Sequence, residues 1–323
     1  MGLSPKNTIW REGPAELWHY RSNRLRYPFP LLIVFSLISR SYILDLVPGD
    51  SFIERLVAAG IDVYMVDWGV PTSSEADHDL DHYACRMIPE LVDAVRRDSG
   101  SARINLLGYC FGGVLALLHA ADRPDTPVNH LVLMACPVDF RLLGPMSELF
   151  GAVDLDPDAL LGPDGNVPPE VIACGFESPA PRGDGGDYAG LWQKLWAGPD
   201  AVAYQAIGRW AVDHIPFPGA AMRQTIRMLF RDNGLMTDRL TARGRSIHLS
   251  DIRTPLLAVL GTRDRITPEA AAAPIAGLTG SRDVELLRLE RGHIGLIAGR
   301  GAARTSMPAI LERLTARSCG IGA

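Results

Sequence analysis

The stretch RINLLGYCFGGVLALLHAA, residues 103–121, carries the strongest fold signal in the chain. A short apolar run leads into a turn with Gly108 and Gly112 on either side of Cys110, and an apolar helix-forming segment follows. This strand–turn–helix context matches the nucleophile elbow Gly-x-Ser-x-Gly, with cysteine in place of serine. Such a turn strains its central residue and needs glycines where a Cβ would clash. It also places Cys110 near a helix N-terminus, where the dipole and free N–H groups favour a thiolate.

Similar apolar runs recur on both sides of this stretch. We predict strands at Leu31–Phe35, Val63–Asp67, Arg103–Leu107, His130–Ala135, Pro255–Leu260 and Val284–Leu289. Amphipathic helices are predicted between some of them, at Ser51–Gly60 with Gly60 as the stop and at Asp79–Asp98 with a kink near Pro89. Near-continuous apolar strands that alternate with helices indicate an α/β fold with a mostly parallel sheet covered on both faces.

The alternation breaks between residues 141 and 250. This segment has Gly/Pro-rich turns at 162–165 and 179–186 and no clear strand pattern, and its aromatic residues include Trp192, Trp196, Trp210, Phe217 and Phe230. A second small domain packed by aromatics would explain it, but we favour a cap (lid) inserted over the carboxyl edge of the sheet, where open α/β folds bind ligands. The predicted division is therefore a core of residues 1–140 and 251–323 and a cap of residues 141–250.

An elbow of this kind needs an acid and a histidine, in that order, in loops after later strands. Asp264 follows the strand Pro255–Leu260, and His293 follows Val284–Leu289 in a Gly-flanked loop. We therefore predict a catalytic triad of Cys110, Asp264 and His293. Asp139 after the strand His130–Ala135 is a rival acid, and we favour Asp264 for its position relative to His293.

The composition excludes several other classes of protein. The chain has 323 residues, a net charge of −5, 47% hydrophobic and 21% charged residues, which is ordinary globular usage without a basic run. Its longest apolar stretch, Leu31–Ile38, falls far short of the roughly 20 residues that span a bilayer. The charged residues within 1–20 argue against a secretory signal. We therefore expect a cytoplasmic protein with no nucleic-acid or membrane partner.

The five cysteines, at positions 85, 110, 136, 174 and 319, form no Cys-x-x-Cys pair. Their odd number favours reduced thiols, and most of them should be small buried fillers. Seven histidines besides His293 stand at 19, 78, 82, 119, 130, 214 and 248, and none lies in a comparable loop; we expect His119 to be structural. No ligand spacing indicates a metal site.

Several segments in one order along the chain resemble the poly(3-hydroxyalkanoate) synthases, an α/β-hydrolase-fold family, and most closely their short class III catalytic subunits. They are residues 31–46 (LLIVFSLISRSYILDL), 63–71 (VYMVDWGVP), 104–113 (INLLGYCFGG), 137–140 (PVDF), 166–170 (NVPPE), 209–213 (RWAVD), 233–235 (NGL), 262–268 (TRDRITP) and 292–295 (GHIG). The family's nucleophile, acid and base fall on Cys110, Asp264 and His293. Its oxyanion donors would be the backbone N–H groups of Phe111 and of Leu37 or Ile38.

The chain departs from the family pattern at three positions. Arg265 stands where the family usually has His, Arg291 where it has Gly, and Ser39 where it has Asn. The resemblance implies an acyltransferase that takes 3-hydroxyacyl-CoA and forms esters through a Cys-bound thioester. The alternative keeps the site but transfers once, cyclises or hydrolyses a CoA- or carrier-protein-bound acyl group. A third reading is a non-catalytic relative that binds granules or a partner through the cap.

The resemblance also implies partners and location. Relatives of this short type work with a second synthase subunit and often form homodimers, and they associate with polymer granules in the cytoplasm. The acyl thioester, on CoA or an acyl-carrier protein, is the expected substrate, and no permanently bound cofactor is expected.

Overall fold

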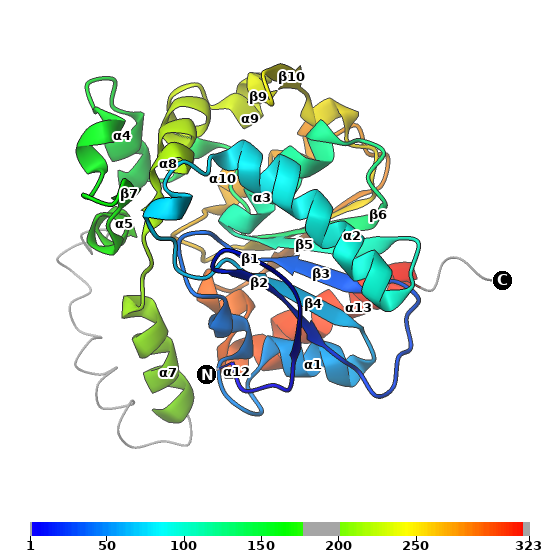
Figure 1. Cartoon of the computed structure of the whole chain (residues 1–323). Coiled ribbons are helices and arrows are strands. Elements are labelled where there is room, and N and C mark those ends of the chain that lie inside the picture. Colours follow the sequence, from blue (N-terminus) through cyan, green and yellow to red (C-terminus); the bar gives the residue numbers. More distant parts are fainter. Residues whose placement is uncertain (1, 177–200, 319–323) are drawn as a thin grey trace.

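The structure, a computed structural model, describes residues 2–176 and 201–318 and is built on one eight-stranded sheet (Figure 1). Its strands, in spatial order, are β1 (Asn7–Glu12), β2 (Ala15–Tyr20), β4 (Val63–Asp67), β3 (Leu31–Val34), β5 (Ile104–Tyr109), β6 (Val128–Met134), β11 (Leu256–Gly261) and β12 (Val284–Leu289). The strands from β4 to β12 run parallel, whereas β1 and β2 pair antiparallel. The predicted mostly parallel α/β sheet is thus confirmed.

The hairpin β1–β2 was not predicted from the sequence. Strand β1 lies at the edge of the sheet, and all six of its residues are exposed or half-exposed. Because an exposed position accepts polar residues, the sequence of β1 has no continuous apolar run. The six parallel strands match the predicted ranges within two residues at either end; five of them are mostly buried, and the edge strand β12 is half-buried. A continuous apolar run signals a central strand clearly.

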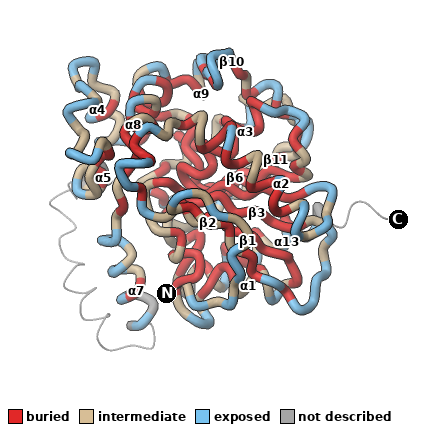
Figure 2. The backbone as a smooth tube through the Cα atoms, in the orientation of Figure 1, coloured by how far each residue is buried: buried red, intermediate tan, exposed pale blue. Residues whose placement is uncertain are grey.

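Helices cover both faces of the sheet (Figure 1). One face packs against α1 (Phe52–Ala59) and α13 (Met307–Ser318), and the other packs against α2 (Ile88–Ser99) and α3 (Phe111–Asp122). Each face of the sheet has its own apolar core. In Figure 2 the buried residues, drawn in red, are concentrated in the sheet between the two layers of helices. This double cover explains why the central strands are apolar on both faces.

The two predicted helices formed, with one difference. The helix α1 has Ser51 as its N-cap, accepting from the Glu54 amide, and ends at Gly60 in the left-handed conformation at φ 94°. The segment predicted as Asp79–Asp98 divides into a π-helical turn, His82–Met87, followed by α2. Pro89 lies in the first turn of α2, where a missing N–H breaks no helical hydrogen bond.

None of the described residues between 141 and 250 joins the eight-stranded sheet. Helices here are α4 (Pro145–Gly151), α5 (Pro169–Phe176), α7 (Ala201–Val212), α8 (Gly219–Gln224), the π-helical Thr225–Arg231 and α9 (Gly234–Thr237). Two small ladders pair β7 (Asn166–Val167) with β8 (Phe217–Pro218) and β9 (Leu240–Ala242) with β10 (Arg245–Ile247). Trp192, Trp196 and the turns at 179–186 lie outside the described residues.

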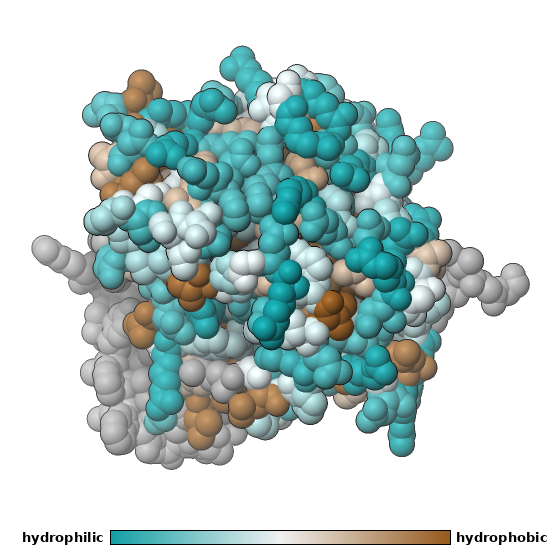
Figure 3. Space-filling model, viewed as in Figure 1, coloured by the Kyte–Doolittle hydropathy of each residue, from teal (hydrophilic) through white to brown (hydrophobic). Residues whose placement is uncertain are grey.

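Short elements complete the fold. They are the 3-10 turns Ser41–Asp45, Ser73–Glu75, Phe140–Leu142, Pro157–Leu160, Leu249–Asp251 and Ile294–Leu296, the π-helical turn Ala302–Ser306, and the helices α10 (Glu269–Ala272), α11 (Ile275–Leu278) and α12 (Gly299–Gly301). In the view of Figure 3 the surface is mainly hydrophilic, with small separate hydrophobic patches. Within residues 2–176 and 201–318, no helix combines the length and the apolar character needed to cross a membrane.

Candidate active site

Cys110 stands at the sharp turn between β5 and α3. Its backbone has φ 54° and ψ −124°, a conformation that side chains other than glycine rarely adopt, and its amide donates to the Met134 carbonyl of the neighbouring strand at 2.8 Å. The helix α3 begins at the next residue, Phe111. The turn therefore fixes the thiol at the carboxyl edge of the sheet, beside the N-terminus of a helix.

The two elbow glycines are required by their close surroundings. A Cβ on Gly112 would lie 2.2 Å from the Val34 carbonyl oxygen at the end of β3, and one on Gly108 would lie 2.5 Å from Cα of Gly113 in α3. Real Cβ atoms do not approach backbone this closely. The strand and the helix can therefore meet at this angle only if both positions lack a side chain, as the sequence motif predicts.

Asp264 and His293 meet beside the elbow. Nδ1 of His293 donates to Oδ2 of Asp264 at 2.7 Å, and both residues are buried. The other carboxylate oxygen of Asp264 accepts the backbone amides of Ile266 at 2.9 Å and Thr267 at 2.8 Å. These three hydrogen bonds hold the carboxylate in one orientation, and the carboxylate in turn holds the imidazole.

His293 also contacts Cys110, because its side chain is hydrogen-bonded to the thiol. Burial by itself lowers the pKa of His293, but the negative charges of Cys110 and Asp264 and their hydrogen bonds outweigh that effect and raise it to about 10. The raised pKa favours the charged imidazolium, which is hydrogen-bonded to the Asp264 carboxylate on one side and to the Cys110 side chain on the other. A cysteine paired with a histidine in this way is the arrangement found in enzymes whose thiol attacks carbonyl carbons.

The rival acid, Asp139, makes different contacts. Its carboxylate accepts the Arg141 amide at 3.1 Å and the Asn233 side-chain amide at 2.9 Å, so that it caps a short 3-10 turn. His119, expected to be structural, is buried on α3 with Nε2 at 3.0 Å from the Thr126 hydroxyl. The carboxylate that the structure brings to His293 is that of Asp264.

The expected oxyanion donors lie on either side of the thiol. Phe111 is the first residue of α3, so the helix itself makes no use of its amide N–H. Leu37 is buried in the core after β3, and its neighbours Ser36 and Ile38 line a cavity together with Cys110. The Ile38 amide lies 3.4 Å from the Ser36 hydroxyl and donates to it. Phe111 and Ile38 both line one cavity with Cys110, whereas Leu37 is not among the lining residues of that cavity or of the one that contains His293, so the two backbone donors stay a prediction.

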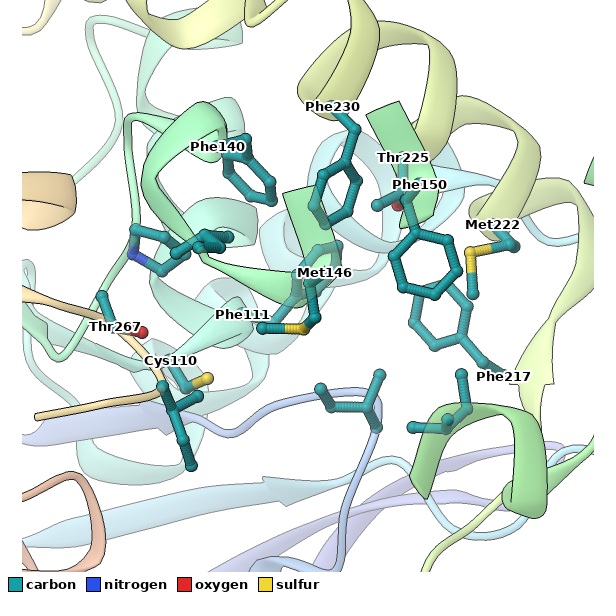
Figure 4. A pocket seen from close by; sticks show the side chains of 15 residues that line it. Cys110, Phe111, Phe140, Met146, Phe150, Phe217, Met222, Thr225, Phe230 and Thr267 are labelled. Atoms are coloured by element: carbon teal, nitrogen blue, oxygen red, sulfur yellow. The ribbon is translucent and has the colours of Figure 1, made fainter. Parts of the chain in front are cut away.

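Two cavities meet at Cys110. The first, which we call the apolar chamber, has a volume of about 70 Å³ (Figure 4). Its lining consists of Ile38, Cys110, Phe111, Pro137, Phe140, Leu143, Met146, Phe150, Ile172, Phe217, Met222, Thr225, Phe230, Ile266 and Thr267. The second, which we call the His293 cavity, is lined by Ser36, Ile38, Ser39, Tyr109, Cys110, Pro169, Glu170, Ala173, Trp210, Ala211, Val212, His214, Ile266, His293 and Ile294.

Three of these lining residues are aromatics of the predicted cap: Phe217 and Phe230 line the apolar chamber, and Trp210 lines the His293 cavity. Met146, Phe150 and Met222 were missed, because single apolar residues on short helices carry no signal that separates a chamber wall from ordinary core.

The three departures from the family pattern differ in their relation to the site. The Arg291 side chain turns away, with Nε donating to the Thr305 hydroxyl at 3.0 Å. Arg265 is exposed to solvent. Ser39 lines the His293 cavity and forms an isolated β-bridge with His214. Only Ser39 of these three therefore borders either cavity.

The other described cysteines have inert surroundings. Burial raises the pKa of Cys85 to about 12 and that of Cys136 well above its ordinary value. The Cys174 side chain and Cys319 are outside the description. Among the described residues no group of three or more His, Cys, Asp or Glu could hold a metal ion.

Comparisons with known proteins agree with this geometry. A protein-family model described as "alpha/beta hydrolase fold" matches residues 44–156. A putative aryl esterase from Burkholderia cenocepacia has a TM-score of 0.57 at 13% identity and covers 97% of this chain and 99% of its own. An enol-lactonase from Burkholderia xenovorans has a TM-score of 0.56 at 13% identity, with coverages of 96% and 100%. These structures share the predicted α/β-hydrolase fold.

The sequence relatives are more specific. The poly(3-hydroxyalkanoate) polymerase subunit PhaC of Allochromatium vinosum is 33% identical over 98% of this chain and 90% of its own length. The protein of the same name from Haloferax mediterranei is 33% identical over 98% of this chain, which spans 65% of that relative. In Synechocystis the corresponding subunit is 28% identical, again over 98% of this chain and over 86% of its own length. The chain therefore belongs to the PhaC family of poly(3-hydroxyalkanoate) polymerase subunits.

Proposed function

We propose that the protein is an acyltransferase that uses Cys110, His293 and Asp264 as a catalytic triad on 3-hydroxyacyl-CoA. The observation that carries the proposal is the hydrogen-bonded chain from the Cys110 thiol through His293 to the buried Asp264 carboxylate, at the edge of an apolar chamber. Membership in the PhaC family supports this choice of substrate and reaction.

The first half-reaction would load the enzyme. The Cys110 sulfur attacks the thioester carbonyl, an S–C bond forms to the enzyme, and the S–C bond to CoA breaks. The proton held by His293 passes to the departing CoA sulfur, which leaves as a thiol. Because one thioester replaces another, the acyl group stays activated.

The second half-reaction would form the ester. His293 accepts the proton of an incoming hydroxyl, whose oxygen attacks the acyl carbonyl, and the bond from that carbonyl to the Cys110 sulfur breaks. Asp264 keeps Nε2 of His293 directed at the reacting atoms and stabilises the imidazolium that forms. The amides of Phe111 and Leu37 or Ile38 would stabilise the oxyanion, at about 3 kcal/mol per donor.

We propose that residues 141–250 act as the cap of this site. The described part of the segment supplies most of the apolar chamber, including Met146, Phe150, Phe217 and Phe230. An apolar lid protects a thioester from hydrolysis, because water that cannot approach the carbonyl cannot compete with the acceptor hydroxyl. The relatives are named as subunits of a polymerase, which supports a second subunit or a second copy as the partner.

Intact-protein mass spectrometry with 3-hydroxyacyl-CoA substrates tests the proposal. We expect a covalent adduct of acyl mass on the wild-type chain, none on Cys110→Ala, and release of free CoA. Absence of both adduct and free CoA across short and medium acyl chains would reject the substrate class.

A single-transfer enzyme is the second candidate, favoured by Ser39, the one family departure that borders the His293 cavity. Product analysis separates the two activities: a ladder of esters supports polymerisation, and one defined product supports a single transfer.

A further inference from the structure

We propose that the end of α7 positions the loop that carries the expected second oxyanion donor, so that Trp210 and Asp213 of the proposed cap assist the acylation of Cys110 by acting on that loop. The inference rests on the proposed function, because it concerns the oxyanion that forms when the thiol attacks a thioester. Two stretches that lie 170 residues apart in the chain are in contact here. We call residues 35–42, which follow β3, the oxyanion loop and residues 210–214 the latch.

The oxyanion loop is fixed to the core near both of its ends. At its start, Nε1 of Trp68 donates to the Phe35 carbonyl at 2.9 Å, and this hydrogen bond is buried. Near its far end, the Ser41 hydroxyl donates to the Asp67 carboxylate. Residues 37–40, which include the expected donors Leu37 and Ile38, lie between these two anchors.

The latch contacts the backbone of this middle part. Nε1 of Trp210 donates to the Arg40 carbonyl at 2.7 Å. Ser39 and His214 pair as an isolated antiparallel β-bridge. The two residues that directly follow Ile38 are therefore connected to the end of α7.

A side-chain contact adds to these backbone contacts. The Tyr42 hydroxyl donates to the Asp213 carboxylate at 2.8 Å, and the same carboxylate lies 3.9 Å from Nε of Arg40. Because the Asp213 side chain is 48% exposed, this contact stabilises the loop less than the hydrogen bond from Trp210 does. Neither Tyr42 nor Asp213 lines the apolar chamber or the His293 cavity, so an effect of either residue on acylation has to pass through the loop.

Helix α7 itself rests on the core. Ala206, Ile207 and Trp210 pack against the apolar core on the α1–α13 face of the sheet. Phe150 of α4 and Met222 of α8 belong instead to the core of the opposite face. Figure 1 shows α7 apart from α4, α5 and α8, three other helices of the proposed cap. The sheet core therefore supports the latch, which in turn holds the loop.

The position of the loop matters because an oxyanion donor acts only over a short range. The donor must lie about 2.7–3.1 Å from the oxygen that becomes charged, and a displacement of about 1 Å can cost about 10²-fold in rate. The Ile38 amide makes a long hydrogen bond of 3.4 Å to the Ser36 hydroxyl, which orients the amide only weakly. Loss of the latch should therefore weaken the stabilisation of the oxyanion while Cys110 and His293 keep their places.

Two reactions of the same thiol separate a role in the oxyanion hole from a role in the triad. Acylation of Cys110 by a 3-hydroxyacyl-CoA passes through a tetrahedral oxyanion. Alkylation by iodoacetamide does not, because the sulfur displaces iodide from a saturated carbon. The full-length chain is treated with 3-hydroxybutyryl-CoA or 3-hydroxyoctanoyl-CoA under single-turnover conditions, and separately with iodoacetamide. Intact mass gives both rates, and peptide mapping assigns each adduct to Cys110.

Three variants are compared with wild type. Trp210→Phe keeps an aromatic ring but removes the N–H donor, so acylation should fall about tenfold or more while alkylation stays within about twofold. Tyr42→Phe should lower the acylation rate at saturating donor about threefold to tenfold and leave the half-saturating concentration unchanged. Trp18→Phe is the matched control on β2, since it removes a hydrogen bond of 2.6 Å from Nε1 to Glu16 and lines neither cavity; it should change neither rate.

Failure of the inference and failure of the proposed function give different results. Unchanged acylation in Trp210→Phe and Tyr42→Phe would overturn the inference, and so would a parallel fall of acylation and alkylation, although the acyltransferase proposal would stand. If circular dichroism shows that Trp210→Phe does not fold, Tyr42→Phe decides alone, because its hydroxyl makes an exposed hydrogen bond. If wild-type Cys110 is alkylated but accepts no acyl group from either donor, the proposed function is wrong, and the inference is overturned with it.

Discussion

Replacing Asp264 by asparagine tests the assignment of the acid most directly, because the surrounding hydrogen bonds dictate how the new side chain must lie. The amides of Ile266 and Thr267 both donate to Oδ1 of Asp264, so an asparagine keeps its oxygen there and directs its NH₂ group at His293. The imidazole must then accept at Nδ1 and carry its proton on Nε2, facing Cys110. In that tautomer it cannot take a proton from the thiol or from an acceptor hydroxyl.

The size of the expected loss in kcat/KM follows from the burial of the Asp264–His293 pair. Both Asp264 and His293 are buried, and their hydrogen bond of 2.7 Å joins two charged groups. Removing one member of a buried charged pair costs about 3–5 kcal/mol. At about 1.36 kcal/mol for each tenfold change, kcat/KM for acyl transfer should fall by about 10² to 10⁴.

Asp139→Asn provides the matched control for this measurement. Asp139 caps a turn and contacts Asn233. The substitution should leave kcat/KM within about threefold, since asparagine caps a helical turn about as well as aspartate and Asp139 does not contact His293. Release of CoA under steady-state conditions measures both variants, with circular dichroism to confirm folding. A larger loss for Asp139→Asn than for Asp264→Asn would show that the acid has been assigned to the wrong residue.

Three further predictions concern the nucleophile, the elbow and the core. Cys110→Ala should abolish acylation and CoA release while thermal unfolding stays near that of wild type; residual adduct would place the nucleophile elsewhere. Gly112→Ala should lower the free energy of unfolding by about 3 kcal/mol, because the new Cβ would lie 2.2 Å from the Val34 carbonyl oxygen; a neutral effect in urea titration would contradict the packing of the elbow. Burial lowers the pKa of His119 from 6.5 to about 4, so the unfolded chain binds more protons than the folded one between these pH values. The stability of wild type relative to His119→Gln should therefore fall by about 3 kcal/mol as pH decreases through that range, and equal pH profiles in chemical denaturation would refute it.

The fold was largely predictable because its central strands are buried on both faces. The apolar runs of β4 and β5 are continuous, so the sequence indicates where these strands begin and end, and Ser51 and Gly60 mark the ends of α1. The hairpin β1–β2 carried no such signal, since an edge strand exposed on one side mixes charged and apolar residues. The short ladders β7–β8 and β9–β10 are too brief to show any periodicity.

The proposed triad residues were predictable for a different reason, which is that each occupies a loop at the end of a strand. The carboxyl ends of parallel strands lie on one edge of the sheet, so Cys110, Asp264 and His293 come together although about 150 residues separate the first from the second. The chamber has no such rule behind it. Met146, Phe150 and Met222 line the cavity that also borders Cys110 because short helices pack there, and that packing depends on contacts that a single sequence does not reveal.

The three positions that differ from the family pattern lie in different surroundings. Arg291 is tied to Thr305 and Gly301 through its guanidinium, so its backbone, and not its charge, borders the loop of His293. Arg265 is exposed to solvent and directly follows Asp264. The Asp264 carboxylate is hydrogen-bonded to the amides of Ile266 and Thr267 and to the His293 imidazole. Neither arginine reaches the reacting atoms. Of the three positions only Ser39, which pairs with His214 in an isolated β-bridge, borders the His293 cavity, so any effect of these departures on the choice of acceptor would have to act there.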